Sequence, residues 1–380
     1  MLKKDVLDIT KKLVAFESVT PADLGCQGYL AELLEEAGFE VFHQKYGEVE
    51  NFFARIGTGS PHLCYAGHTD VVPPGPLDKW SYPPFEPTVA DGVLYGRGVA
   101  DMKGSVAAFA AAAIDYVRQN GAPEAGSISF LITGDEEGPA VDGTVKVLEW
   151  MEANGHIPDA FLVGEPTSPD HLGQEIKVGR RGSLNGTLTV EGVQGHVAYP
   201  ERSNNPMPVL VKLADALNSH VFDEGTEFFA PTNLEMTSID VGNSASNVTP
   251  DSGVAKFNIR FNDAWVYKTL DAELRRILDA VSSDYTLETT SGAEGFITQP
   301  NDFTETVKAA VTHVTGRNQV PDYTTTGGTS DARFTAQYAP TVEFGPINAT
   351  IHQIDENLKV SDLEDTAVIF RRVIELYLAV

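Results

Sequence analysis

Residues 127–138 read SISFLITGDEEG and join a strongly apolar run to three adjacent acids. The apolar part, Ser127–Ile132, predicts a buried strand. The acids Asp135, Glu136 and Glu137 would repel one another unless a cation lies among them, and a metal ion is the natural counterion. Adjacent side chains point apart, so one glutamate can bind an ion while its neighbour acts as a base. A solvated acidic turn is the alternative interpretation.

The motif GHTD, residues 67–70, directly follows another apolar run, Leu63–Ala66. In an extended backbone His68 and Asp70 project to the same side. An imidazole nitrogen of His68 can therefore bind a metal ion while the nearby carboxylate accepts the other ring N–H. A loop histidine beside a solvated aspartate is the simpler alternative.

Two further candidates come after predicted strands. Glu165 follows the run Phe161–Val163, and His352 lies just past the run Thr341–Phe344. Neither residue indicates a site alone, but open α/β sheets assemble their sites at the carboxyl ends of strands. Two imidazoles and at least three carboxylates match zinc, and they are enough for two ions if one carboxylate is shared.

A glycine-rich segment, GRGVADMKG at residues 96–104, precedes an alanine-rich helix predicted from about Gly104 to Val117. A phosphate-binding loop would need a final Gly-Lys-Ser/Thr, which this segment lacks. Asp101, an acid among glycines that let the backbone approach a ligand closely, instead suits a carboxylate that bridges two ions.

The order of predicted elements indicates an α/β fold with a largely parallel sheet covered on both faces. After Gly179 the order becomes strand, helix, strand, strand, helix, strand, which is typical of a ferredoxin-like α+β module. The α/β pattern then resumes. We therefore expect one domain made of residues 1–180 and 295–380, and a second domain, residues 181–294, inserted into it.

Composition narrows the possible functions. The 380 residues are enough for two or three domains, and the formal net charge of −27 disfavours binding to nucleic acid or to an anionic membrane. The two cysteines form no paired framework, which favours a reducing compartment. The amino-terminal segment lacks the apolar stretch of a signal peptide, and the most apolar segment, Val106–Ile114, is too short to span a bilayer. We expect a soluble cytoplasmic protein.

Eight motifs spread in order over the chain resemble the zinc-dependent aminoacylase and carboxypeptidase family. Within it they are most similar to members that hydrolyse N-succinyl-L,L-2,6-diaminopimelate in lysine biosynthesis. No metal-ligand position departs from the family pattern. The motifs are GHTDVVPPG (67–75), GRGVADMKG (96–104), TGDEEG (133–138), VGEPT (163–167), GRRGS (179–183), QGHVAYP (194–200), GGTSDARF (327–334) and NATIH (348–352).

The resemblance implies a dizinc hydrolase whose mixed, mostly parallel sheet is flanked by helices, with an inserted ferredoxin-like dimerisation domain. It implies two zinc ions per subunit, for which cobalt could substitute. His68 and Glu165 would bind one ion, Glu137 and His352 would bind the other, and Asp101 would bridge both. Asp70 would orient His68, Glu136 would be the general base, and the Asp101–Met102 peptide would be cis.

The resemblance also implies a homodimer acting on a small N-succinyl amino acid. His196, with Asn247 as its companion, would reach into the partner's site. A set of four residues would hold the succinyl carboxylate, with Arg181 as an alternative to the first of them: Arg180, Arg260, Thr329 and Asn348. The alternatives are an acetylornithine deacetylase or a dipeptidase of the same family, and a noncatalytic binding protein that has lost its metals.

Overall fold

A computed structural model describes residues 2–316 and 320–379 and divides the chain into two compact units. The first unit contains Met1–Val178, Thr298–Thr324 and Ser330–Val380, and the second contains Gly179–Ile297 and Thr325–Thr329. Residues 325–329, which the sequence places in the first domain, therefore group with the second unit. Within the described ranges, no helix is long and apolar enough to cross a membrane.

The first unit alternates strands with helices, as the sequence predicts. Its helices are α1 (Leu2–Val14), α2 (Cys26–Glu36), α3 (Lys103–Asn120), α4 (Thr144–Ala153), α7 (Asp302–Thr315), α8 (Ala332–Thr335) and α9 (Val360–Leu378), with a 3-10 turn η1 (Leu77–Lys79). Its strands are β1 (Glu40–Tyr46), β2 (Val49–Thr58), β3 (His62–His68), β4 (Thr88–Ala90), β5 (Val93–Tyr95), β6 (Gly126–Thr133), β7 (Ala160–Val163), β8 (Glu175–Lys177), β17 (Asp322–Thr324), β18 (Thr341–Glu343) and β19 (Asn357–Lys359).

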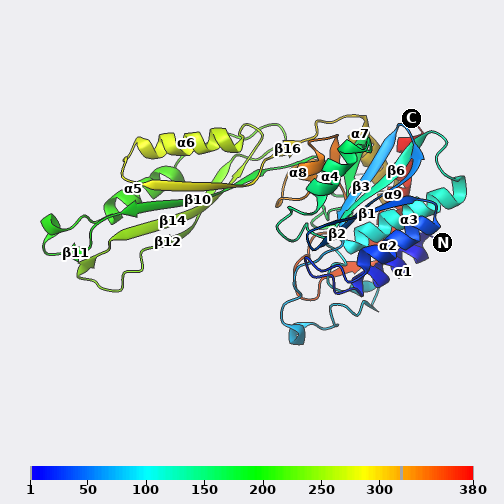
Figure 1. Ribbon diagram of the computed structural model, residues 1–380, viewed down its shortest axis with the longest axis horizontal. Helices are drawn as coiled ribbons and strands as arrows, with labels where there is room; N and C mark the ends of the chain where they lie inside the picture. The colour runs from blue at the N-terminus through cyan, green and yellow to red at the C-terminus, as the bar shows by residue number, and fades with distance from the viewer. Residues whose placement is uncertain (1, 317–319, 380) are drawn as a thin grey trace. The chain divides into compact units, whose positions relative to one another are not determined.

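The main sheet of this unit has the order β1-β2-β6-β3-β7-β18-β8-β17 (Figure 1). The four strands β6, β3, β7 and β18 run parallel to one another, and β8 is parallel to β17. The pairs β1–β2, β2–β6 and β18–β8 are antiparallel. The predicted mixed, mostly parallel sheet is confirmed.

Helices cover both faces of this sheet. Tyr65 of β3 and its register partner Phe130 of β6 pack on α3, where the rings of Tyr65 and Phe109 stack with centroids 4.5 Å apart. The next residue along β6 faces the opposite side, and its register partner Phe53 packs on Trp150 of α4, 5.8 Å between centroids. Burial on both faces explains why these strands read as continuous apolar runs.

Apolar spacing predicts helices over residues 22–37 and near residues 141–151, but both begin later, because aspartates hold the preceding backbone in turns. The carboxylate of Asp23 accepts the N–H groups of Gly25 and Gln27, so α2 begins at Cys26 and not near Ala22. In the same way Asp135 accepts the N–H groups of the two residues at 141 and 142, and α4 begins at Thr144.

His62, at the start of β3, is buried, and its Nε2 lies 2.7 Å from Ser129 Oγ. Burial and the charge of Arg55 lower the pKa of His62 to about 3. The folded protein thus keeps this imidazole neutral, whereas the unfolded chain takes up a proton near pH 6.5. Acid therefore favours the unfolded state as the pH falls from 6.5 toward 3.

We expect His62→Gln to reduce the acid sensitivity of the first unit. Between pH 6 and pH 4 the free energy of unfolding of the unmodified protein should fall more steeply than that of the variant, by about 1.4 kcal/mol per pH unit. Urea titrations of the metal-free proteins at several pH values measure this difference, since all other titrating groups are shared. Parallel pH profiles would contradict the assignment.

The second unit has the ferredoxin-like order of elements that the sequence predicts. Its main sheet is antiparallel in the order β12-β14-β10-β15, and two helices lie along it (Figure 1). Alternate residues of β10 and β14 are buried against the helices, which gives this sheet one apolar face. The elements are β9 (Gly179–Arg180), β10 (Gly182–Glu191), β11 (Gly195–His196), η2 (Pro200–Arg202), α5 (Met207–Asn218), β12 (Asn233–Asp240), β13 (Val248–Thr249), β14 (Ser252–Phe261), α6 (Tyr267–Asp279), β15 (Thr286–Ala293) and β16 (Phe296–Ile297).

Candidate metal centre

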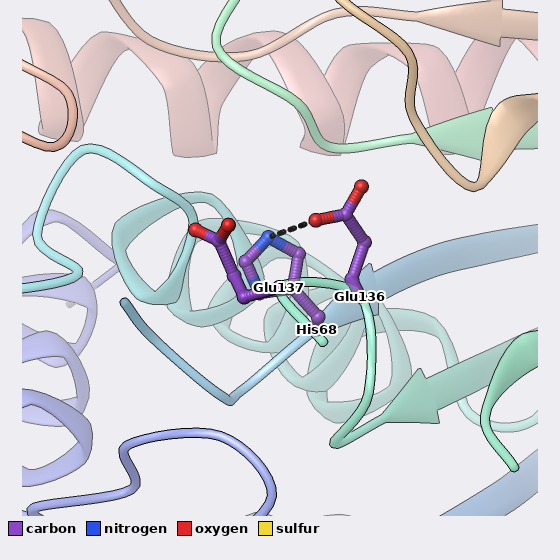
Figure 2. A group of neighbouring side chains, drawn as sticks. All are labelled: His68, Glu136 and Glu137. Atoms are coloured by element: carbon purple, nitrogen blue, oxygen red, sulfur yellow. Dashed lines mark ion pairs between the residues drawn. The ribbon is translucent and has the colours of Figure 1, made fainter. Parts of the chain in front are cut away.

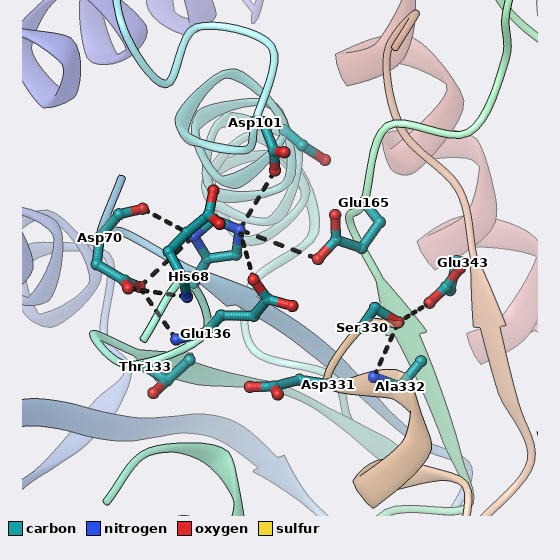
Figure 3. A network of polar contacts seen from close by, with 12 residues as sticks. His68, Asp70, Asp101, Thr133, Glu136, Glu165, Ser330, Asp331, Ala332 and Glu343 are labelled. Atoms are coloured by element: carbon teal, nitrogen blue, oxygen red, sulfur yellow. Dashed lines mark hydrogen bonds and ion pairs between the residues drawn. The ribbon is translucent and has the colours of Figure 1, made fainter. Parts of the chain in front are cut away.

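The predicted acids and imidazoles of the first unit meet at one edge of the main sheet. His68 is the last residue of β3 and pairs in register with Thr133, the last residue of β6. Strand β7, on the other side of β3, ends at Val163, two residues before Glu165. Because these strands are parallel, their carboxyl ends lie side by side, and the loops after them bring the side chains together (Figure 3).

One group of potential ligands is fully buried and consists of His68, Asp101 and Glu165. His68 Nε2 lies 3.3 Å from Asp101 Oδ1 and 3.9 Å from Glu165 Oε1. One donor atom from each of the three residues lies within 4.8 Å of the others. The three side chains can therefore coordinate a single ion.

A second group consists of Asp101, Glu137 and His352. His352 Nε2 lies 3.2 Å from Asp101 Oδ2 and 2.9 Å from Glu137 Oε1. Asp101 thus presents one carboxylate oxygen to each imidazole, which is the arrangement that a bridging ligand requires. The Asp101–Met102 peptide is cis, as the resemblance implies.

Glu136 and Glu137 lie on opposite sides of the His68 ring (Figure 2). Glu136 Oε2 is 3.9 Å from His68 Nε2, and the donor atoms of His68, Glu136 and Glu137 also lie within 4.8 Å of one another. Glu137 makes the closer contact with an imidazole, at 2.9 Å from His352. Geometry therefore favours Glu137 as a ligand and leaves Glu136 beside the centre.

Asp70 joins the strand that carries His68 to the loop that carries the two glutamates. His68 Nδ1 lies 2.8 Å from the backbone carbonyl of Asp70 and 3.6 Å from its carboxylate. The carboxylate instead accepts the N–H groups of Glu136 and Glu137, at 3.4 and 3.1 Å. The closest partner of the His68 ring is thus a carbonyl and not the carboxylate that the sequence suggests.

The acids and imidazoles of this site shift one another's pKa values. Burial opposes protonation of His68, but contacts with Asp101, Glu136 and Glu165 raise its pKa well above the usual value. Hydrogen bonds to Asp101 and Glu137 raise the pKa of His352 to about 10. Burial, followed by the charge of Glu165, raises the pKa of Glu136 well above its usual value. These shifts arise because acids and imidazoles are crowded together in a buried place, which is the setting that suits a bound cation.

The residues present fit a pair of divalent ions. Asp101 Oδ1 is buried and accepts no hydrogen bond of good geometry within the described structure, and its nearest polar contact is the 3.3 Å approach of His68, so this oxygen is available as a ligand atom. Carboxylates and neutral imidazoles are the ligands that zinc and similar ions take. The two groups share Asp101, so the donors are sufficient for two ions.

Asp331 is a neighbour of this site that the sequence analysis did not single out. It lies in the motif GGTSDARF, it is 6% exposed, and neither carboxylate oxygen has a hydrogen-bond partner among the described residues. Burial raises its pKa to about 6. Figure 3 shows its carboxylate on the side of Glu136. Its motif was the only sequence signal that could have pointed to it.

Four of the remaining candidates belong to the second unit, in two pairs. Arg180 of β9 is buried and donates to the carbonyl of Gly328, next to Thr329, at 3.0 Å. His196 pairs with Val248, and the N–H of Val197 donates to the carbonyl of Asn247 at 3.1 Å. The structure thus brings together Arg180 with Thr329, and His196 with Asn247.

The other two candidates lie one in each unit. Arg260 lies on β14 opposite Ser183 in β10. Asn348, in the first unit, donates its backbone N–H to Ser168 at 3.0 Å. Arg181, the alternative to Arg180, donates to Asn233 at 2.8 Å and is therefore already engaged.

A family model described as peptidase family M20/M25/M40 matches residues 64–376 of this sequence, which include all five candidate ligands. The chain belongs to this peptidase family. Two solved structures resemble the whole chain. One is an M20 family metallo-carboxypeptidase from Sulfolobus solfataricus (TM-score 0.79, 17% identity, 99% of this chain and all of the other) and the other is the aminopeptidase PepT of Bacillus cereus (TM-score 0.78, 19% identity, 100% and 99%). These likenesses establish the M20 fold.

Nearer relatives in sequence carry a more specific name. A protein of Methylobacterium nodulans named succinyl-diaminopimelate desuccinylase is 51% identical, over 98% of this chain and 96% of its own. One of Rhodopseudomonas palustris with the same name is 50% identical over 99% of both chains. The resemblance within the M20 family that the sequence motifs indicate is thus confirmed at full length.

Proposed function

We propose that this protein hydrolyses N-succinyl-L,L-2,6-diaminopimelate to succinate and L,L-2,6-diaminopimelate, a step of lysine and peptidoglycan-precursor synthesis. The observation that carries the proposal is near 50% identity, over almost the whole length, to relatives named for this reaction. The grouped ligands around Asp101 support it, because amide hydrolysis at neutral pH needs an activated water.

Two zinc ions, which cobalt could replace, would be held by His68 and Glu165, by Glu137 and His352, and by Asp101 between them. When bound, such a pair lowers the pKa of a water molecule and polarises a carbonyl oxygen. The family's structures include a Bacillus subtilis protein described as a dinuclear metal-binding peptidase, with a TM-score of 0.70.

Glu136 acts on protons in this proposal. It lies beside His68 without the short imidazole contact that Glu137 makes, and its buried carboxylate has a raised pKa. A base with raised proton affinity takes the proton of the attacking water and then returns it to the departing amine. Asp70 keeps Glu136 in place through its backbone N–H.

The succinyl group ends in a carboxylate, which a guanidinium recognises better than an ammonium does. Arg180 and Arg260, with Thr329 and Asn348, are the residues proposed to hold it. Arg181 remains the alternative to Arg180: both side chains already donate a hydrogen bond, to Asn233 and to the carbonyl of Gly328, and the family resemblance favours Arg180. An acetyl group has no carboxylate for these arginines to bind.

The substrate is tested by comparing two amides on the zinc-loaded protein. Succinate release from N-succinyl-L,L-2,6-diaminopimelate should exceed hydrolysis of N-acetylornithine by about 10²-fold or more in kcat/KM, since hydrogen bonds to a charged group contribute about 1.5 to 3 kcal/mol. Faster turnover of N-acetylornithine, or of a dipeptide, would refute the proposal.

Arg260→Met gives a sharper version of the same test. It should lower the rate with the succinyl amide and spare the acetyl amide. Arg275→Met is the matched control, since Arg275 lies on α6 of the same unit and pairs with Asp271 at 2.9 Å. Equal effects of the two substitutions would remove Arg260 from the substrate site.

The proposed working form is a cytoplasmic homodimer in which the second unit contributes to the partner's site. His196 Nδ1 accepts the N–H of Ala198 at 3.0 Å, so in the neutral ring the proton is on Nε2. The side chain is exposed, and Nε2–H can donate to an oxyanion of another chain. Asn247, whose carbonyl accepts the N–H of Val197, is proposed to enter the partner's site together with His196.

A further inference from the structure

A single buried carboxylate joins the loop that carries Asp101 to the loop that carries His352. Glu356 is fully buried, and its Oε1 accepts the N–H groups of Ala100 and Asp101 at 2.9 and 3.1 Å. Its Oε2 accepts a hydrogen bond from Arg97 Nη1 at 2.6 Å. Every oxygen of this side chain is therefore directed at the segment 97–101.

The backbone of Glu356 makes a further contact with the same segment. Its carbonyl accepts the N–H of Gly96 at 3.0 Å, and the following strand β19 pairs antiparallel with β5, which ends at Tyr95. Glu356 therefore holds the segment 96–101 in two ways: its main chain and β19 pair with Gly96 and β5, and its carboxylate binds residues 97–101.

The other end of the connection is the turn that carries His352. Thr350 Oγ1 donates to the carbonyl of Asn357 at 2.9 Å and accepts its N–H at 3.1 Å, which closes the turn around residues 351–356. Asp355 accepts the N–H and the hydroxyl of Ser81, both at 2.7 Å. His352 itself has a positive φ of 61°. These contacts fix the position of His352 relative to Glu356 within the same turn.

A contribution to folding stability does not by itself explain the buried ion pair of Arg97 and Glu356. A buried ion pair has a desolvation cost that its attraction often fails to exceed, and apolar residues of similar volume are frequently as stabilising. Arg97 is 2% exposed and Glu356 is 0% exposed, so both charges bear that cost. Three donors converging on one carboxylate, one of them the N–H of a candidate ligand, instead indicate a positional role.

We propose that Glu356 is a positioning residue for the metal centre, which sets the separation of Asp101 and His352 and thereby the affinity of the ion shared by Asp101, Glu137 and His352. The inference rests on the proposed metal centre and adds a residue that contacts no ion. Asp101 belongs to both groups, whereas the turn that contains Glu356 supplies His352 to only one of them, so the ion of His68, Asp101 and Glu165 depends less on Glu356.

The test measures Zn²⁺ binding to the full-length metal-free protein by calorimetry with a competing chelator. Glu356→Gln keeps the volume and one acceptor oxygen but removes the charge that Arg97 needs. We expect one of the two ions to bind 10- to 100-fold more weakly, as is typical when an outer partner of a ligand is lost, and the other to change by less than about threefold.

Asp115→Asn is the matched control. Asp115 of α3 pairs with Arg371 of α9 at 3.3 Å, and both side chains are 10% exposed. The other side-chain hydrogen bonds of this pair among the described residues go to Gln119 on α3 and Glu375 on α9. Asp115→Asn should leave both zinc affinities unchanged. Equal weakening of both ions by Glu356→Gln, unchanged binding, or the same selective loss in Asp115→Asn would overturn the proposal.

A second variant covers the case in which Glu356→Gln does not fold. Arg97→Lys keeps the positive charge but cannot reproduce the guanidinium geometry. It should lower the affinity for the same ion selectively, but to a smaller degree, and unchanged binding would also overturn the proposal.

The binding measurement uses no substrate, so it separates the role of Glu356 from the proposed function. Selective loss of one ion in a protein inactive on succinyl amides would refute only the proposed function, and normal binding in an active protein would refute only the role of Glu356.

Discussion

Glu136→Gln is expected to leave both metal ions bound and to lower turnover of the succinyl amide by about 10² to 10⁴-fold. The amide side chain fills the same space but cannot take a proton from water. Glu136 lies 3.9 Å from His68, whereas Glu137 makes the 2.9 Å contact with His352 (Figure 2). Elemental analysis of the purified variant gives metal content, and initial rates at saturating substrate give turnover.

Asp101→Ala is the control that shows how a variant without bound metal behaves. Asp101 faces both imidazoles, so its removal should release metal and abolish activity together. If Glu136→Gln lost metal while Glu137→Gln kept it, the roles of the adjacent glutamates would be reversed. Asp101→Ala with full metal content and normal rates would exclude a bridging carboxylate.

His196→Ala is expected to lower turnover by about 10² to 10³-fold with metal content intact, because loss of one oxyanion donor costs roughly 2.7 to 4 kcal/mol. His196 belongs to the second unit, whereas the candidate ligands all belong to the first. The expected loss of activity without loss of metal separates an oxyanion donor from a ligand.

Mixing variants tests whether His196 acts in its own chain or in its partner's. A dimer of one His196→Ala subunit and one Glu136→Gln subunit contains one site with both natural residues if sites are shared. Random exchange should then restore roughly a quarter of normal activity, since half of the dimers are mixed and each has one intact site. No recovery after demonstrated exchange would place His196 in its own chain's site.

A second mixture provides the control. Glu136→Gln mixed with Asp101→Ala leaves a damaged metal centre in every subunit, so no arrangement of partners restores an intact site. Recovery in that mixture would reveal an effect of mixing unrelated to His196.

Much of this fold is predictable because the apolar residues of its cores form either unbroken runs or regular alternation along the sequence. Strands such as β6 are buried along their whole length, and β10 and β14 alternate between buried and exposed positions. Helix starts were less predictable, because the carboxylates of Asp23 and Asp135 compete with helix for the preceding N–H groups. Strands of three residues, such as β8 and β17, are too short to show a period.

Some residues of the candidate metal centre could likewise be predicted from the sequence, and others could not. His68, Glu137 and Glu165 could be predicted since each lies at or shortly after the end of an apolar strand. Glu356 could not, because its partner Arg97 stands 259 residues away and neither residue belongs to a periodic pattern. Asp331 carried no signal beyond its motif, because a buried carboxylate that accepts no hydrogen bond is recognised only once its surroundings are known.

The position of β18 in the sheet has a consequence for how the protein is made on the ribosome. Strand β18 lies between β7 and β8, although it is formed by residues 341–343, and His352 follows it. Until that part of the chain emerges, two strands made much earlier have exposed edges, and such edges promote aggregation. Premature termination before residue 341 would therefore yield chains prone to aggregation and degradation, and no partly active enzyme would accumulate.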